Sequence, residues 1–356
     1  MTLFEQRNNP AMAGKIRIQG NAARFIQLRN CQDLAVSLRI DAYRLQLLVL
    51  QPKYNCYSVR KPKGGFRLIE DPQGRLKSVQ SRLNDFLQSA YLPLRPECAY
   101  GFTRAKSEDD DRTVVGNALQ HLGCRYLLNI DLKDFFHQVS DEKIDGVWQS
   151  HFRRFDAGLR QLLTVLVCFR QRLPMGAPTS PALSNFASLE MDHHLTEYAH
   201  RSCMHYTRYA DDLSFSSTEP IGKGEYHDLR NIIGECGFEV NPSKVRWFGD
   251  GEAKEITGIE LGEECLRLPG NYLGRLAREI ERYRAFFELE SRYQTGASGK
   301  KLKLFEQELR GKLEFARQVL TEDDPEWQKL AESFEQAQFA LEDFESVDWL
   351  DCPYLY

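Results

Sequence analysis

Three aspartates have the type and spacing needed for metal-dependent phosphoryl chemistry. Asp131 lies in the apolar run YLLNIDL at residues 126–132, and Asp211 and Asp212 are adjacent within MHYTRYADDLSFSS at residues 204–217. A lone charge on a buried strand is costly, and neighbouring carboxylates repel each other unless a cation neutralises them. Three carboxylates that converge from adjacent strands can hold two Mg²⁺ ions for in-line displacement at phosphorus. Taken singly, each of these aspartates is more typical of a turn or a strand end.

The surrounding pattern predicts the elements that would position these aspartates. Residues 126–132 read as a buried strand, and residues 204–217 as two strands around an Asp-Asp tip. Elsewhere the sequence predicts helices across 22–50 with Asp41 as an N-cap, a basic hairpin turning at Gly64-Gly65, and helices at 76–91, from Pro181, and twice within 270–320. This mixture of strands and helices predicts an α+β fold.

Charge is distributed unevenly along the 356 residues. The net charge is -4 overall, but residues 1–80 carry +9, residues 81–265 carry -8, residues 266–320 carry +5 and residues 321–356 carry -10. Two basic segments around an acidic middle are typical of phosphate-binding parts that flank a metal centre, although solvated charged faces give the same pattern. The nine cysteines show no Cys-x-x-Cys pair, and the N-terminus lacks the apolar core of a signal peptide. We therefore expect a cytoplasmic protein with no zinc site and no membrane partner.

An ordered series of segments resembles the reverse transcriptases. Tyr209 to Asp212 is similar to their Tyr-x-Asp-Asp box, and three further segments resemble other polymerase motifs: NIDLKDFF at 129–136, LPMGAPTSPALSNF at 173–186 and GFEVNPSK at 237–244. Asn117-Ala-Leu-Gln-His121 and Ile256-Thr-Gly258 resemble signatures of the bacterial retron group. The resemblance covers residues 34–320 and implies a right-hand polymerase with fingers, palm and thumb.

The resemblance implies roles for individual residues. Asp131, Asp211 and Asp212 would bind two Mg²⁺ ions, and Lys244 would protonate or stabilise the leaving pyrophosphate. A further group of residues would bind the incoming deoxynucleoside triphosphate. Arg67, with Lys63 as a weaker candidate, would bind the triphosphate. Phe136 would act as a gate against a 2'-hydroxyl, and Gly176 and Pro178 would lie beneath the nascent base pair. The alternatives are a solvated Arg67, an ordinary surface Lys244 and a core Phe136, with Phe135 as the other aromatic that could fill the core.

Further residues would bind RNA. Asn117 and His121, spaced i, i+4 on one predicted helix face, would contact RNA or fix the scaffold; a helix cap or core histidine is the alternative. The thumb would grip the template–primer duplex through seven cations: Arg275, Arg278, Arg282, Lys301, Lys303, Arg310 and Lys312. Met175 stands where the family usually has Gln, which puts a hydrogen bond near the template or nucleotide in doubt.

The predicted domains are N-terminal helices and fingers at 1–115, palm at 116–265, thumb at 266–320 and an acidic tail at 321–356 that docks a partner or folds back on basic surface. The resemblance implies an RNA-directed DNA polymerase that copies its own noncoding RNA from an internal 2'-hydroxyl into a branched RNA–DNA hybrid. It also implies a role in antiphage defence with a separate effector protein. The alternatives are another bacterial reverse transcriptase, of intron or abortive-infection type, and a noncatalytic RNA-binding scaffold.

Overall fold

The computed structural model describes residues 10–61, 64–293, 299–320 and 323–345. The chain divides into two compact units. The first comprises Met1–Gln120 and Cys124–Glu252, and the second comprises His121–Gly123 and Ala253–Tyr356. Within the described residues, no helix is both long and apolar enough to span a membrane.

The first unit begins with three helices, α2 (Pro10–Ile26), α3 (Cys31–Leu38) and α4 (Ala42–Leu50). The predicted cap is confirmed, because Asp41 accepts hydrogen bonds from the backbone N–H groups of Tyr43 and Arg44 at 3.0 and 3.2 Å. Buried leucines of α3 and α4 anchor these helices in the main core.

A two-stranded antiparallel hairpin follows, formed by β1 (Tyr54–Arg60) and β2 (Phe66–Pro72). Its turn uses Gly64 and Gly65 with φ of 95° and 79°, a left-handed backbone that glycine adopts without a Cβ clash. The outer part of β2 is exposed, whereas Glu70 and Pro72 at its inner end are buried. Helix α5 (Gly74–Tyr91) packs next to this inner end.

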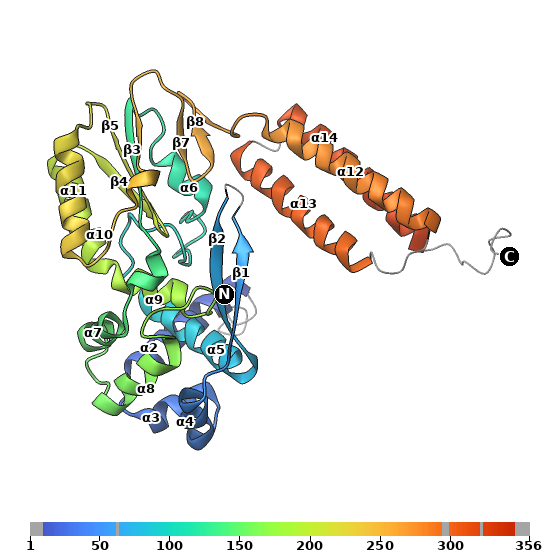
Figure 1. Ribbon diagram of the computed structural model, residues 1–356. Coiled ribbons are helices and arrows are strands. Elements are labelled where there is room, and N and C mark those ends of the chain that lie inside the picture. Colours follow the sequence, from blue (N-terminus) through green and yellow to red (C-terminus); the bar gives the residue numbers. More distant parts are fainter. Residues whose placement is uncertain (1–9, 62–63, 294–298, 321–322, 346–356) are drawn as a thin grey trace, which may run out of the picture. The chain divides into compact units, whose positions relative to one another are not determined.

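A four-stranded antiparallel sheet holds the predicted aspartates. Its strand order is β4-β5-β3-β6, from β3 (Tyr126–Asp131), β4 (His205–Tyr209), β5 (Asp212–Ser217) and β6 (Arg246–Phe248). Helices α10 (Leu189–Arg201) and α11 (Lys223–Glu235) run along the sheet (Figure 1), with α10 packed on β4 and on α11. The predicted strands and their Asp-Asp tip are thereby confirmed.

Shorter helices complete the first unit. They are α6 (Val114–Leu119), the 3-10 helix η1 (Phe135–Gln138), α7 (Asp141–His151), α8 (Ala157–Val167), α9 (Ser180–Ala187) and the 3-10 helix η2 (Pro242–Lys244). Of these, η2 contacts β3. One continuous apolar core joins η1, α7, α8 and α9 to the sheet, with Trp148 and Phe215 fully buried within it. Rigid packing of this kind fixes where the ends of the strands lie.

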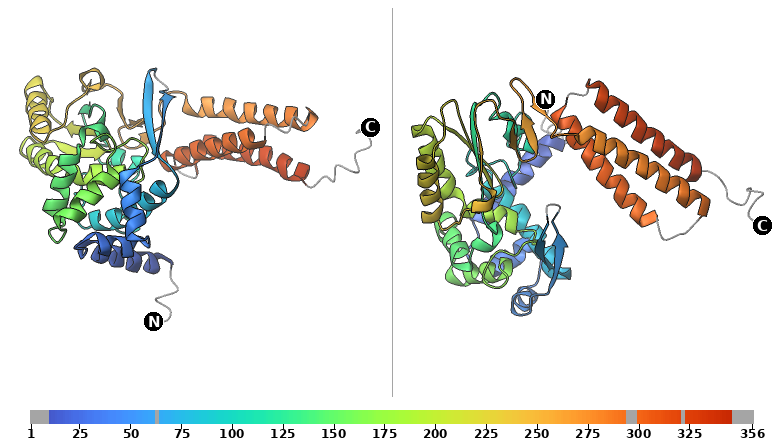
Figure 2. Two further views of the ribbon diagram at one scale, coloured as in Figure 1. Left: turned by 60° about the horizontal axis from the view of Figure 1, so that its bottom comes forward. Right: turned by 45° about the horizontal axis from the view of Figure 1, so that its top comes forward.

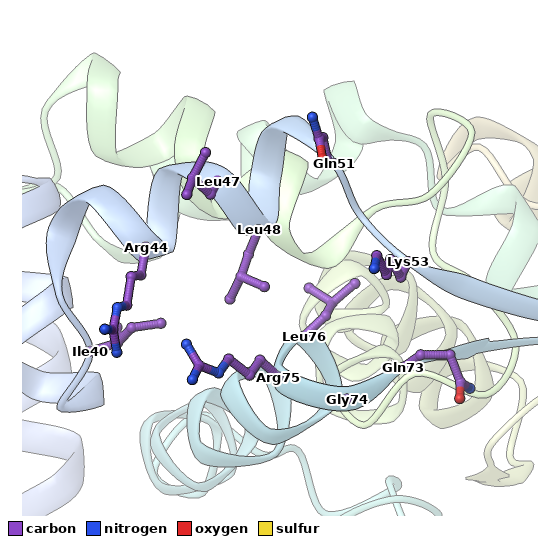
Figure 3. Close-up of a pocket in the computed structure, with 10 residues that line it drawn as sticks. All are labelled: Ile40, Arg44, Leu47, Leu48, Gln51, Lys53, Gln73, Gly74, Arg75 and Leu76. Carbon is purple, nitrogen blue, oxygen red and sulfur yellow. The ribbon is translucent and has the colours of Figure 1, made fainter.

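A groove of about 400 Å³ lies between α4 and the start of α5. Figure 3 shows aliphatic side chains of both helices, Leu48 and Leu76, turned into the groove, with Arg44 and Arg75 at one end. None of its lining residues belongs to the predicted site. The groove is therefore separate from the chemistry predicted for the aspartates.

The second unit contains a small antiparallel sheet and three long helices. The sheet has the order β7-β8-β9, from β7 (Lys254–Ile256), β8 (Ile259–Leu261) and β9 (Leu266–Arg267). The helices α12 (Tyr272–Tyr293), α13 (Gly299–Val319) and α14 (Pro325–Glu345) run alongside one another (Figures 1 and 2). Their shared core includes Leu276, Tyr283 and Leu309.

Two predicted boundaries need correction. The predicted palm extended to residue 265, but β7, β8 and β9 pair in a sheet of their own and fall in the second unit. Within the segment predicted as an acidic tail, Pro325–Glu345 forms α14, whose Phe334 and Ala337 are buried in the same core as α12 and α13. Of the two roles considered for this segment, folding back onto the basic helices is the one this packing supports.

Candidate active site

The β-sheet register brings the predicted aspartates to one end of the sheet. Asp131, the last residue of β3, lies directly opposite Asp212, the first residue of β5. Asp211 occupies the turn between β4 and β5, and its carbonyl accepts a hydrogen bond from the backbone N–H of Leu132 at 3.0 Å. Two residues therefore close the hairpin, and all three aspartates lie around the carboxyl end of β3.

The hairpin turn is tightly confined by a neighbouring segment. Ala210 has a φ of 59°, a left-handed conformation that is unfavourable for a residue with a side chain. Gly101 lies against it: a Cβ at Gly101 would be 2.4 Å from the backbone nitrogen of Ala210. Only glycine permits this approach, so the 98–102 segment and the turn must be built together.

A fully buried arginine supports the same turn. The Arg208 guanidinium donates two hydrogen bonds to Asp192, both of 2.7 Å, one to Asn185 Oδ1 at 3.0 Å and one to the carbonyl of Ala210 at 3.1 Å. Asn185 in turn donates to the carbonyl of Gly101 at 3.0 Å. Arg208 and Asp192 are both 0% exposed, so this ion pair is shielded from water and holds the turn from inside.

The carboxylates repel one another. Desolvation, followed by repulsion from Asp131, raises the pKa of Asp211. Desolvation by the surrounding protein, together with repulsion from Asp211 and Asp131, raises the pKa of Asp212 to about 7, although its side chain is exposed to solvent. Such shifts mean that the negative charge gathered here is only partly balanced by the protein.

Lys244 supplies part of that balance. Its Nζ lies 2.6 Å from Asp131 Oδ2, and Asn241 Nδ2 lies 3.4 Å from Asp131 Oδ1. Desolvation opposes the charge on Lys244, but its hydrogen bond to Asp131 and the attraction of all three carboxylates together raise its pKa. Lys244 therefore lies among the aspartates, as the sequence predicts, and its ammonium group would compete with a metal ion for Asp131.

Comparison with known proteins identifies the family to which this chain is similar. The reverse transcriptase (RNA-dependent DNA polymerase) family matches residues 59–274. The retron Ec86 reverse transcriptase of Escherichia coli is 30% identical over 246 residues, which cover 67% of this chain and 72% of that protein. The retron Mx65 reverse transcriptase of Myxococcus xanthus is 33% identical over 258 residues, covering 67% of this chain and 56% of that protein.

The chain belongs to the retron-type reverse transcriptases. It is an RNA-directed DNA polymerase, and the reverse transcriptase family uses divalent metal ions. Among solved structures, telomerase from Candida albicans with a telomeric RNA fragment gives a TM-score of 0.43 at 12% identity, covering 85% of this chain and 62% of that one. The mixed helix and sheet architecture agrees with the polymerase fold that the sequence predicted.

The carboxylates of this reverse transcriptase fit a divalent ion by their chemistry. Carboxylate oxygens are the ligands that Mg²⁺ prefers, and a bound cation would relieve the repulsion among Asp131, Asp211 and Asp212. Within the described residues, no three acidic, histidine or cysteine side chains are already gathered at ligand distance. Because Lys244 holds Asp131, we expect ion binding to exchange this contact for a metal bond.

The residues predicted to bind the nucleotide lie in three segments around the aspartates. Arg67, exposed on β2, is near enough to Asp211 to lower its pKa by charge attraction. Gly176 approaches the same strand: a Cβ there would be 3.0 Å from Ile69 Cγ2, and its φ is 125°. Pro178 follows in the loop that leads into α9. Lys63 lies outside the described residues.

The two adjacent phenylalanines of η1 have different environments. Phe135 is 3% exposed and packs on Phe238, with ring centroids 5.7 Å apart, so it is the core residue. Phe136 is only partly buried, and its ring lies 5.7 Å from that of Phe102. The alternative in which Phe136 fills the core is therefore not supported, and the gate role stays a prediction.

Met175 contributes through its backbone. Its carbonyl accepts a hydrogen bond of 2.7 Å from the backbone N–H of Glu70 in β2. This contact depends on the main chain and is available to any residue at this position. The departure from the usual Gln thus leaves the loop's attachment to β2 intact.

Asn117 and His121 differ from their prediction. Helix α6 ends at Leu119 with Gln120 as its cap, so His121 lies beyond the helix and the two residues do not share a helix face. Both side chains are 1% exposed. Their burial favours the scaffold role that the sequence left open over direct contact with RNA.

The seven predicted thumb cations fall into two groups. Six are exposed: Arg275, Arg278 and Arg282 on α12 and Lys301, Lys303 and Arg310 on α13. Two of the seven are engaged with carboxylates: the half-buried Lys312 lies 2.6 Å from Glu279 and 2.7 Å from Glu308, and the exposed Arg310 lies 3.0 Å from Glu306. Engaged cations attract phosphate less, so the other five are the better candidates.

Sequence reasoning missed the buried charges behind the site. Arg208 stands next to the Tyr-x-Asp-Asp box, and Asp192 lies in MDHHL of α10, but charged residues are ordinarily exposed. The alternation of side chains along a strand offers one sequence signal for the burial of Arg208, because it places Arg208 on the same face of β4 as Tyr206. Tyr206 also donates a hydrogen bond to Asp192, at 3.0 Å. Nothing in the linear sequence pairs that face with α10.

Proposed function

We propose that this reverse transcriptase copies a cognate structured noncoding RNA into DNA, starting from an internal 2'-hydroxyl, and so makes a branched RNA–DNA hybrid. The proposal includes an antiphage defence system with a separate effector protein. One observation carries it: in a retron-type chain, Asp131 and Asp212 face each other across paired strands with Asp211 in the adjoining turn. A noncatalytic scaffold would have no use for mutually repelling carboxylates at this point.

In this proposal Asp131, Asp211 and Asp212 hold two Mg²⁺ ions. When bound, the ions would activate the attacking hydroxyl and stabilise the leaving pyrophosphate. Lys244, which lies 2.6 Å from Asp131, is placed to give a proton or a positive charge to the pyrophosphate. Lysine is protonated at neutral pH, so in this proposal Lys244 can supply positive charge to the pyrophosphate.

The same proposal assigns the incoming deoxynucleoside triphosphate to the face bounded by β2, η1 and the loop before α9. Arg67 binds the triphosphate as a bidentate guanidinium, with Lys63 as a second candidate. Phe136 excludes a 2'-hydroxyl, and Gly176 and Pro178 support the nascent base pair. The proximity of Arg67 to Asp211 and of Gly176 to Ile69 supports this assignment.

Template and primer are assigned to the three-helix unit acting as a thumb. Five exposed cations, Arg275, Arg278, Arg282, Lys301 and Lys303, provide contacts to phosphate that do not depend on sequence, and the exposed but ion-paired Arg310 is a weaker candidate. The β1–β2 hairpin would belong to the fingers and the four-stranded sheet to the palm. Cytoplasmic location and the residue limits of these domains remain part of the proposal.

Sequencing the nucleic acid that copurifies with the enzyme tests the retron assignment. We expect one RNA species joined to a DNA copy of part of itself, with the branch removed by a 2',5'-debranching enzyme. Asp211→Ala and Asp212→Ala proteins should copurify the RNA without DNA. Random cellular RNA would instead favour a reverse transcriptase of intron or abortive-infection type.

A further inference from the structure

A buried glutamate joins the three segments assigned to the nucleotide. Glu70, at the inner end of β2, is 0% exposed. Arg172 Nη2 donates to Glu70 Oε1 at 3.1 Å, and Arg170 Nη1 lies 3.9 Å from the same oxygen. His137 Nε2 lies 3.3 Å from Glu70 Oε2. The carboxylate is therefore bracketed by cationic or ionisable groups from two other segments.

The backbone of Glu70 makes a third attachment. Its N–H donates to the carbonyl of Met175, and its own carbonyl would lie 3.2 Å from a Cβ at Gly176. The loop that carries Gly176 is thus held against β2 with no room for a side chain. One residue, through its side chain and its main chain, connects β2, η1 and the 170–176 loop.

Each connected segment carries a residue of the proposed nucleotide site. Arg67 lies three residues before Glu70 on the same strand, Phe136 immediately precedes His137, and Gly176 immediately follows Met175. A shift of Glu70 would therefore move the triphosphate ligand, the gate and the floor relative to one another. Misplacement by about 1 Å is enough to weaken catalytic geometry substantially.

The free-energy cost of burying the charges of Glu70 and Arg172 argues for a role beyond packing. A buried ion pair rarely adds stability over apolar residues of similar volume, because both charges lose their hydration. Desolvation, together with repulsion from Arg172, lowers the pKa of His137, so Glu70 is balanced chiefly by arginine at neutral pH. Charge-assisted hydrogen bonds do offer directional fixation, which apolar contacts lack.

We propose that Glu70 is a positioning residue for nucleotide selection, which sets the mutual placement of Arg67, Phe136 and Gly176 through Arg172, His137 and the Met175 carbonyl. This inference rests on the proposed nucleotide site. Glu70 touches neither the nucleotide nor the aspartates; it acts through the segments that do.

Steady-state DNA synthesis by Glu70→Gln tests the role. The amide keeps the size of the side chain but removes the charge that holds Arg172 by a hydrogen bond and lies 3.3 Å from His137 Nε2. We expect the KM for deoxynucleotides to rise about tenfold and the preference for deoxy- over ribonucleotides to fall about tenfold, while kcat changes less than twofold. A merely structural glutamate would lower the active fraction, and so kcat, and leave KM and sugar preference unchanged.

Asp71→Asn is the matched control, since Asp71 is the next residue, undergoes the same carboxyl-to-amide change and pairs with Lys77 at 2.8 Å outside the cluster. It should keep the wild-type KM and sugar preference. Should Glu70→Gln not fold, as judged by thermal unfolding, His137→Gln at the 22% exposed side of the cluster carries the same prediction. Wild-type KM and preference in the folded variant would overturn the positioning role alone, whereas a wild-type enzyme that makes no DNA would overturn the proposed function.

Discussion

At the scale of single residues, the repulsion among the carboxylates has a measurable pH signature. Asp212 has a pKa raised to about 7 in the metal-free protein, and the pKa of Asp211 is shifted in the same direction. A proton must leave before such a carboxyl binds a cation. Apparent affinity for Mn²⁺, measured by electron paramagnetic resonance, should therefore rise about tenfold from pH 6 to pH 8 and level off above pH 8.

Asp212→Asn provides the control for this titration. It removes the group that titrates near neutrality, so the remaining binding should be weaker and should change less between pH 6 and pH 8. Equal affinity of the wild-type protein at pH 6 and pH 8 would contradict the shifted pKa.

The two phenylalanines of η1 should separate substrate choice from stability. Phe136→Ala should lower the preference for deoxy- over ribonucleotides at least about tenfold, because the proposed nucleotide site loses the half-buried ring assigned to exclude a 2'-hydroxyl. Phe135→Ala should instead lower the free energy of unfolding by about 3–5 kcal/mol, because it empties a core position next to Phe238. Single-nucleotide incorporation and chemical denaturation measure the two effects. A change in sugar preference for Phe135→Ala alone would reverse the assignment.

At the scale of elements, the β4–β5 turn depends on its close neighbour. Gly101→Ala would place a methyl group 2.4 Å from the Ala210 nitrogen, so the turn bearing Asp211 must shift. We expect kcat for DNA synthesis to fall about a hundredfold, with stability reduced by about 1–3 kcal/mol.

Gly146→Ala is the matched control for Gly101→Ala. Gly146 lies within α7, and a Cβ there meets no atom within 4 Å outside its own helix backbone and chain neighbours. It should retain full activity and gain about 0.5–1 kcal/mol of stability from better helix propensity. Unchanged kcat in Gly101→Ala would show that the confinement of the turn does not matter for activity.

The elements themselves follow from local sequence signals, whereas their connections do not. Period-two and helical patterns predicted β3, the β4–β5 hairpin and the basic helices, and Asp41 marked a helix start. Arg208 and Glu70 escaped prediction because their partners lie 16 and 102 residues away in sequence, at Asp192 and Arg172. The strands and helices can therefore be predicted from the sequence. The ion pairs that hold the site, Arg208 with Asp192 and Glu70 with Arg172, depend on tertiary contacts that the sequence does not show.

Helix α14 escaped prediction for a different reason. Carboxylates dominate the composition of the segment after residue 320, and the sequence therefore predicts an acidic tail that docks a partner or folds back on basic surface. Phe334 and Ala337, three residues apart, form the buried stripe of an amphipathic helix, and Trp327 Nε1 donates to the carbonyl of Leu313 at 3.2 Å. Average charge concealed a helical periodicity that was present in the sequence.

At the scale of the whole molecule, this correction changes what truncation should do. Removing residues 321–356 strips α14 from the core shared by Leu276, Tyr283 and Leu309. We expect the truncated protein to unfold at a lower temperature and to bind RNA more weakly, because α12 and α13 carry the exposed cations. An unaltered melting curve after this deletion would contradict the three-helix core.

The most direct test of the whole account is DNA synthesis by the purified ribonucleoprotein with Mg²⁺ and labelled deoxynucleotides, and without added primer. Wild-type protein should yield DNA covalently attached to its RNA and released by 2',5'-debranching. Asp211→Asn and Asp212→Asn, which keep the shape of the hairpin but lose one charge each, should yield at least about a thousandfold less. Equal product from the wild-type protein and these variants would contradict the assignment of Asp131, Asp211 and Asp212 as the catalytic centre.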